Sequence, residues 1–119
     1  NSGEHFYHLL LNKKFKEAYE RNEMLTVVLD GTEGYAPSFI DEAFGNLVYD
    51  FSTDVVKKHL TIISNEEPVW IQAIEKDTFP KWEERRKGNM RPTVSLKHSP
   101  WYRLINNIVE EKIWEEPAK

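Results

Sequence analysis

Apolar positions along the chain predict helices that alternate with short strands. Between Ser2 and Arg21 they recur at spacings of three and four, which is typical of an amphipathic helix, and Ser2 is expected to cap it. The run 24–30 is apolar and β-branched and predicts a strand buried on both faces, and 60–64 predicts a second buried strand. Because a helix is expected between them, the strands should be parallel and joined by a right-handed crossover.

The helix between the strands is predicted to open at Ser38. Asp41 stands three residues later, which completes a capping-box pattern ahead of an apolar helix face. Gly45 within this helix indicates a close approach to the sheet. A third helix is expected after 65–68, with a kink at Pro80 because proline lacks the N–H donor of the helical hydrogen bond.

The C-terminal part of the chain has a less regular pattern. Residues 93–97 alternate well enough to predict an edge strand. From Ser99 onward the apolar residues fit helical spacing, and Pro100 suits the first position of a helix. The pair Asn106–Asn107 leaves a hairpin open as the alternative.

The length of 119 residues suits one domain with a real core and not two. We expect an α/β domain over 1–86, with a small parallel or mixed sheet flanked by helices. Residues 87–119 should form an extension packed on this domain, with an edge strand and a helix.

Composition excludes several classes of function. Without cysteine there is no disulfide framework, thiolate zinc site or iron–sulfur cluster. A formal net charge of −4 argues against the phosphate backbone of nucleic acid as the main partner. The longest apolar runs are far shorter than the ~18 residues that a membrane span requires. These features favour a cytoplasmic protein with no membrane contact.

The spacing of the histidines gives little indication of a metal site or of a catalytic base. Glu4, His5 and His8 occupy neighbouring positions of the first helix, and two imidazoles at that spacing could hold a metal. No third ligand is apparent, so we expect no metal and no cofactor. His98 precedes the predicted last helix and is interpreted as a boundary residue rather than a catalytic base. Trp82 lies among charged residues, which leaves a contact surface open as its role.

The loop between the first strand and the Ser38 helix is the best candidate site, because ligands and partners usually bind at such strand-to-helix turns. It lacks the glycines and lysine of a phosphate-binding loop and the glycines of a serine-hydrolase elbow. Ser38 is therefore either a helix cap or a phosphoacceptor. A phosphate there would lie at the positive end of the helix dipole, close to the carboxylates of Asp41 and Glu42.

Three stretches carry a family resemblance: residues 2–6, residues 27–30 and, above all, 34–48, which reads Gly-Tyr-Ala-Pro-Ser-Phe-Ile-Asp-Glu-Ala-Phe-Gly-Asn-Leu-Val. Over roughly residues 2–75 the chain resembles the bacterial STAS-like family of unknown function, whose members carry a Ser-Gly-Glu-x-Phe start and a Ser-Phe-Leu-(Asp/Glu)-Glu-Ala-Phe-Gly-Gly-Leu core. That family is similar in turn to anti-sigma factor antagonists. They pair with a histidine-kinase-like ATPase that phosphorylates a serine at the position of Ser38.

The resemblance implies a STAS-like α/β fold and a noncatalytic regulatory module that binds another protein. Partner switching with a histidine-kinase-like ATPase or an anti-sigma-type protein is the implied role, with Ser38 as phosphoacceptor. No pairing of base and nucleophile is visible that would indicate an enzyme. The expected contact surface consists of Tyr35, Pro37, Ser38, Phe39, Asp41 and Glu42.

The predicted sheet is small for such a fold. A STAS sheet has four or five strands, and an isolated pair of strands is not stable. Strands upstream of Asn1, the predicted strand at 93–97, or a second copy of the chain could supply the missing edge. The last of these would make the protein a homo-oligomer.

A basic segment at 85–97 supports an alternative function as a nucleic-acid-associated regulator, with flanking tryptophans available to stack on bases. A solvated linker is the competing interpretation. The basic residues of this segment are Arg85, Arg86, Lys87, Arg91 and Lys97.

Overall fold

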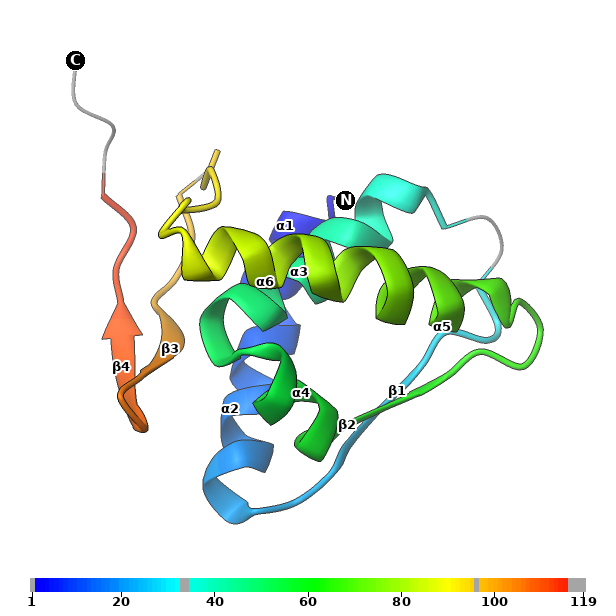
Figure 1. Ribbon diagram of the computed structural model, residues 1–119, viewed down its shortest axis with the longest axis horizontal. Coiled ribbons are helices and arrows are strands. Elements are labelled where there is room, and N and C mark those ends of the chain that lie inside the picture. Colours follow the sequence, from blue (N-terminus) through cyan, green and yellow to red (C-terminus); the bar gives the residue numbers. More distant parts are fainter. Residues whose placement is uncertain (1, 33–34, 96, 116–119) are drawn as a thin grey trace.

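The computed structural model describes residues 2–32, 35–95 and 97–115 and has α/β architecture. Helices occupy the middle of the molecule, with the β1–β2 sheet on one side and the β3–β4 hairpin on the other (Figure 1). In chain order the elements are α1 (Gly3–Phe6), η1 (Tyr7–Leu11), α2 (Asn12–Arg21), β1 (Leu25–Val28), α3 (Pro37–Phe51), α4 (Thr53–His59), β2 (Leu60–Ile63), α5 (Val69–Ala73), η2 (Ile74–Thr78), α6 (Phe79–Lys87), β3 (Trp101–Ile105) and β4 (Ile108–Lys112).

The predicted N-terminal helix is confirmed as one continuous path through α1, η1 and α2. Ser2 caps it by accepting a 3.0 Å hydrogen bond on its hydroxyl from the His5 amide. In η1 the chain makes a wide π turn, so that the Asn12 amide donates to the carbonyl of Tyr7. Asn22, with φ 53°, ends the path in the left-handed conformation.

Strands β1 and β2 are parallel as predicted, with Leu25 opposite Leu60. The prediction that β1 is buried on both faces is wrong. Its exposure alternates, and Val28 is 56% exposed, because only one face of the sheet packs against the core. The strand therefore follows the pattern of a half-buried sheet rather than that of the centre of a doubly covered one.

The edge strand predicted at 93–97 is also wrong: no strand is present among its described residues, and Leu96 lies outside them. Pro92 has no N–H to donate, and the amide of Ser95 is taken by the carboxylate of Glu4 at 3.2 Å. In the described part of the chain, the β1–β2 sheet has two strands. That strands upstream of Asn1 or a second copy of the chain pair with its open edges remains a prediction.

Helix α3 begins at Pro37, one residue before the predicted cap. Ala36 is the N-cap and provides no side-chain hydrogen bond, while Pro37 occupies the first turn. The capping-box prediction for Ser38 and Asp41 is therefore wrong. The φ of proline is already helical, so Ser38 lies inside the helix with its side chain exposed.

The middle of α3 is buried, and α6 covers it. Gly45 faces the indole of Trp82, which a Cβ at that position would overlap, so the close approach is to α6 and not to the sheet as predicted. Trp82 is 4% exposed, and its interpretation as a contact-surface residue is wrong. A large ring can lie here because residue 45 has no side chain.

The helical path continues from α5 through η2 into α6, which Figure 1 shows as one run across the molecule. Instead of a kink at Pro80, the turn before it widens, and the amide of Phe79 donates to the carbonyl of Ile74. The missing N–H of Pro80 is accommodated by this π turn.

The helix predicted beyond Ser99 is wrong, and the hairpin alternative is confirmed. Strands β3 and β4 are antiparallel, with Ile105 opposite Ile108. Asn106 and Asn107 connect them with φ of 51° and 64°, the conformation of a type I′ turn, which asparagine tolerates better than most residues.

Buried polar contacts attach the hairpin to the helices. The side-chain amide of Asn12, which is fully buried, donates to the carbonyl of Tyr102 and accepts from its amide, both at 2.8 Å. It also donates to the hydroxyl of Tyr7, which in turn donates to Asp50. The Nε of Arg103 donates to the other oxygen of Asp50 at 2.6 Å.

Among the residues that the structure describes, no helix has the length and apolar character needed to cross a membrane.

Candidate functional site

The turn that leads into α3 presents an apolar surface. The ring of Phe39 lies between those of Tyr35 and Phe6, with centroids 5.7 and 5.6 Å away. Pro37 and Ser38 are exposed beside this stack. The structure thus brings together the predicted contact residues Tyr35, Pro37, Ser38 and Phe39 around stacked aromatic rings.

Gly3 explains how the N-terminal helix comes so close to this turn. A Cβ on Gly3 would collide with the carbonyl oxygen of Phe39, so only glycine allows α1 to lie against the first turn of α3. Phe6 is carried on the same short helix. The contact therefore holds the aromatic stack in place.

A groove of about 410 Å³ lies beside Ser38, between α3 and the α5–η2 path. Its lining includes Pro37, Ser38, Trp70, Ala73, Asp77 and Lys81. The indole Nε1 of Trp70 is buried and has no hydrogen-bond acceptor within the described ranges. This atom has almost no exposed surface, so it offers no donor to a ligand in the groove.

Asp41, one of the predicted contact residues, lines the groove and also makes polar contacts within the chain. Its carboxylate accepts from Thr78 Oγ1 and from Trp82 Nε1, both at 3.1 Å, and pairs with Lys81 Nζ at 2.9 Å. These three donors largely satisfy the two carboxylate oxygens. Asp41 therefore fixes α3 to η2 and α6 at the wall of the groove.

Glu42 faces α1, where its side chain contacts Gly3. Burial raises the pKa of the Glu42 carboxyl, and the nearby carboxylates of Glu4 and Asp41 raise it further. Of the six predicted contact residues, Pro37 and Ser38 are exposed, and the other four are half-buried.

Ser38 has no hydrogen-bonded base. Its hydroxyl makes no hydrogen bond to a histidine or carboxylate in the described part of the chain, and it lies in the first turn of a 15-residue helix. The positive end of this helix favours a negative charge, and Lys81 offsets the charge of neighbouring Asp41. These surroundings suit a serine modified by another protein better than a nucleophile activated in place.

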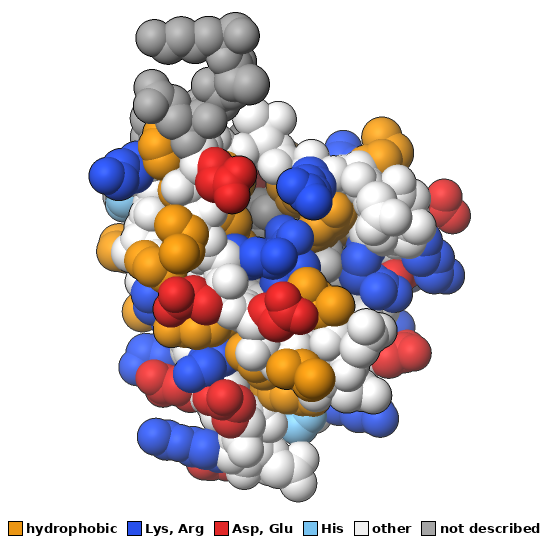
Figure 2. Space-filling model, turned by 90° about the vertical axis from the view of Figure 1, so that its left-hand side faces the viewer, with side chains coloured by type: hydrophobic (Ala, Val, Ile, Leu, Met, Phe, Trp, Pro, Cys, Tyr) orange, Lys and Arg blue, Asp and Glu red, His pale blue; other side chains and the backbone are white. Residues whose placement is uncertain are grey.

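The predicted basic residues do not form one stripe. The guanidinium of Arg85 lies 4.6 Å from the ring centre of Trp82, and Arg86 Nε donates to Glu83 at 2.7 Å. Lys87 lines a cavity beside α4, and Lys97 is exposed. Figure 2 shows the face that carries the hairpin, where Lys and Arg side chains lie in a recess near its centre with acidic side chains beside them.

A cavity between the end of α6 and the hairpin contains two residues, Arg103 and Lys112, that the sequence analysis missed. Arg86 and Arg91 share this cavity with Arg103 and Lys112 of the hairpin. The missed signal is the alternation within 101–112, which places residues 103 and 112 on one face once the hairpin is recognised.

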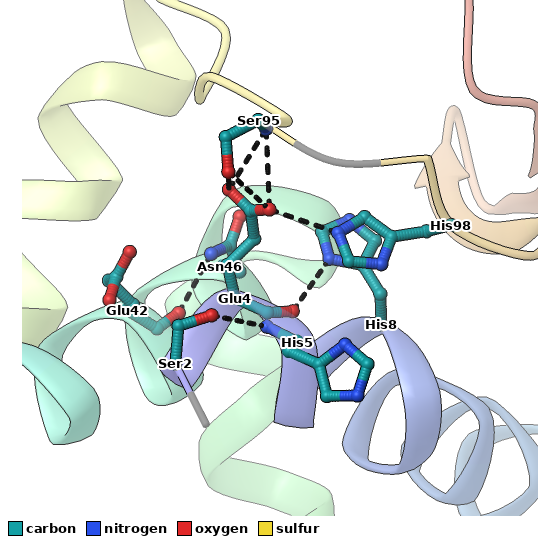
Figure 3. A network of polar contacts seen from close by, with 8 residues as sticks. All are labelled: Ser2, Glu4, His5, His8, Glu42, Asn46, Ser95 and His98. Atoms are coloured by element: carbon teal, nitrogen blue, oxygen red, sulfur yellow. Dashed lines mark hydrogen bonds and ion pairs between the residues drawn. The ribbon is translucent and has the colours of Figure 1, made fainter.

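A second missed feature is a buried polar cluster around Glu4, drawn in Figure 3. The carboxylate accepts from the amide and hydroxyl of Ser95 and lies 2.9 Å from His98 Nε2. The His98 ring stacks on His8, whose Nδ1 lies 2.9 Å from the Glu4 carbonyl oxygen. The boundary interpretation of His98 was therefore incomplete, because its side chain joins the extension to α1.

The pKa values in this cluster follow from burial and hydrogen bonding. Burial lowers the pKa of the His8 imidazole to about 4. For Glu4, burial raises the pKa, but the hydrogen bonds from His98 and Ser95 outweigh it and the net pKa is lowered. Within residues 2–32, 35–95 and 97–115, no group of three His, Cys, Asp or Glu side chains is arranged to hold a metal ion.

Comparison with known proteins gives one family. The model of a STAS-like domain of unknown function (DUF4325) matches residues 2–70. Neither the curated proteins nor the solved structures gave a match. The matched range contains the aromatic stack, Ser38 and both strands of the parallel sheet, and it ends before the hairpin.

Proposed function

Because the chain belongs to the family of STAS-like domains of unknown function, we propose that it is a noncatalytic regulatory module that binds a protein partner. The partner docks on the first turn of α3 and the groove beside it. The observation that carries the proposal is the exposed Pro37–Ser38 turn, flanked by the Phe39 aromatic stack and by a groove of about 410 Å³.

The chemistry of this surface supports a protein partner. An aromatic stack with an exposed proline gives apolar area that loses little side-chain entropy on binding. Trp70 adds an indole ring to the lining of the groove. Val69, which is 61% exposed, extends the apolar area beside Trp70.

Phosphorylation of Ser38 is the proposed switch. A histidine-kinase-like ATPase would transfer the γ-phosphoryl group of ATP to Ser38 Oγ, with release of ADP and of the hydroxyl proton. The new dianion lies at the N-terminal end of α3, where the helix dipole favours it. The phosphate also adds negative charge to the docking surface, so a partner that binds through an apolar surface dissociates. This is partner switching, and an anti-sigma-type protein is the second candidate partner.

The proposal is tested with a purified histidine-kinase-like ATPase from the organism that makes this protein. Binding is measured by calorimetry for the wild type, Phe39→Ala and Ser38→Asp. Both variants should weaken binding by at least about ten-fold, because the first removes the stacked ring and the second adds charge at the interface.

Asn107→Asp is the matched control, since it adds the same carboxylate at an exposed turn of the hairpin. It should bind like the wild type. Equal affinity of all four proteins would refute the docking surface. Incubation with ATP followed by mass spectrometry of the Ser38 peptide then decides whether phosphorylation occurs.

Self-association through the sheet is a further part of the proposal. The β1–β2 sheet has open edges in the described chain, and Val28 exposes apolar area on its outer face. A second copy of the chain that paired its own strand with one of these edges would extend the sheet. Light scattering should then give the mass of a dimer for the wild type and of a monomer for Val28→Lys.

A further inference from the structure

The cavity between the end of α6 and the β3–β4 hairpin has a volume of about 350 Å³ and an unusual lining. Four of its lining residues are cationic and none is acidic: Arg86, Arg91, Arg103 and Lys112. These residues come from three separate segments of the chain. All four lie outside the range that matches the family, so family membership does not account for this cavity.

The charges in the cavity are only partly matched. Arg103 is paired with Asp50 and Arg86 with Glu83. Arg91 and Lys112 have no carboxylate within ion-pair distance in the parts of the chain that the structure describes. Two positive charges therefore remain unpaired, which is the charge needed to balance a dianion.

Arg103 is held ready for a ligand. Its Nε donates to Asp50, and its guanidinium lies 5.0 Å from the ring centre of Tyr49. Because Asp50 is buried and also accepts from Tyr7, the carboxylate cannot turn away. The terminal nitrogens of Arg103 have no hydrogen-bond acceptor among the described residues, and such a fork matches the oxygens of a phosphate group.

The surroundings of the cavity favour a small ligand over a nucleic acid. Glu110, Glu111 and Glu115 are exposed on the hairpin and the segment that follows it. Figure 2 shows acidic side chains beside the recessed cations on this face. A nucleic-acid backbone running across the face would meet these carboxylates, whereas a single phosphate group inside the recess would contact the cations.

We propose that this cavity binds one phosphate group, either as the free ion or as the monoester of a small phosphorylated molecule. Arg91 and Lys112 neutralise its charge, and Arg103 orients it through paired hydrogen bonds. The proposal does not depend on docking at Ser38, which lies on another surface.

Titration followed by NMR tests it, with inorganic phosphate in one series and glucose 6-phosphate in another, at constant ionic strength. The amides of Asn89 and Arg91 should shift and saturate. In the double variant Arg91→Gln/Lys112→Gln the affinity should fall by at least about ten-fold, because two charge-assisted contacts are lost. Lys14→Gln, which removes an exposed lysine of α2, should leave it unchanged.

Saturable binding lost only in the double variant supports the proposal, and the series with the higher affinity then shows whether free phosphate or a monoester is preferred. Shifts that do not saturate, or that are equal in all three proteins, would overturn it. So would tighter binding of a single-stranded oligonucleotide than of either small ligand, since the cavity would then belong to a nucleic-acid surface.

Discussion

The imidazole rings of His8 and His98 stack with their centroids 4.3 Å apart and their planes 6° from parallel. One ring comes from the N-terminal helix, and the other comes from the segment that leads into the hairpin (Figure 3). Glu4 lies beside both, bound to His98 through its carboxylate and to His8 through its carbonyl. This contact joins the N-terminal helix to the segment that precedes β3, and it includes the buried imidazole of His8.

Acid should weaken the protein through His8. Burial lowers its pKa from 6.5 to about 4 in the folded state, so below pH 6.5 the unfolded chain binds a proton that the folded chain does not. The free energy of unfolding should therefore fall as pH decreases from 6.5 to 4, by about 3 kcal/mol at most. Urea unfolding across this range measures it.

His8→Gln should flatten this part of the pH profile, while His5→Gln should leave it unchanged, because His5 is exposed on the same helix. Below pH 4.5 a further loss should follow in both variants, since the lowered pKa of Glu4 makes its ionised form a source of stability. A profile of the His8→Gln variant as steep as that of the wild type would contradict this account.

Gly45→Ala should destabilise the protein by about 2 kcal/mol or more, because the added Cβ overlaps the Trp82 ring and the core has no space to receive it. Trp82 would also lose its hydrogen bond to Asp41 if it moved. Urea unfolding followed by tryptophan fluorescence measures the change. Gly88→Ala is the control, since the nearest atom to its Cβ would be 3.5 Å away, and it should be close to neutral.

Arg103→Met should cost about 3 kcal/mol, because it leaves the Asp50 carboxylate buried without its cation. Burial already raises the pKa of Asp50, and Arg103 opposes that effect. The double variant Asp50→Asn/Arg103→Met should recover part of the loss, since no unpaired charge remains. Equal stability of the single and double variants in urea would show that the charge is not the cause.

The hairpin turn can be tested at Asn107. Its φ of 64° costs less for glycine than for a side chain, so Asn107→Gly should stabilise the hairpin by about 0.5 kcal/mol. Asn107→Val should destabilise it by about 1 kcal/mol or more, because a β-branched residue resists positive φ. Hydrogen exchange of the amides in β3 and β4 reports both changes, and an opposite order would exclude a type I′ turn.

Some features of this fold depend on neighbours in sequence, and the amino-acid pattern alone determined them. The Ser2 cap is a hydrogen bond between residues three positions apart in the chain. The apolar residues that follow recur at a spacing that fits a helix and not a strand. The parallel pairing of 25–28 with 60–63 follows from the helix between them. The proximity of Tyr35, Pro37, Ser38 and Phe39 was also predictable, because these residues lie within five consecutive positions, whereas Phe6 joins them from α1.

Other features depend on residues far apart in the chain, and only the tertiary structure decided them. Residues 101–112 fit helical and strand spacing alike, and the strand form is the one whose backbone binds Asn12 while Arg103 reaches Asp50. Because proline suits the first turn of a helix, α3 begins at Pro37, and Ser38 lies inside the helix instead of capping it. The hairpin lies beside Arg91, and this brings Arg86, Arg91, Arg103 and Lys112 into one cavity. The spacing of residues within one segment cannot predict a contact between two segments that are far apart in the chain.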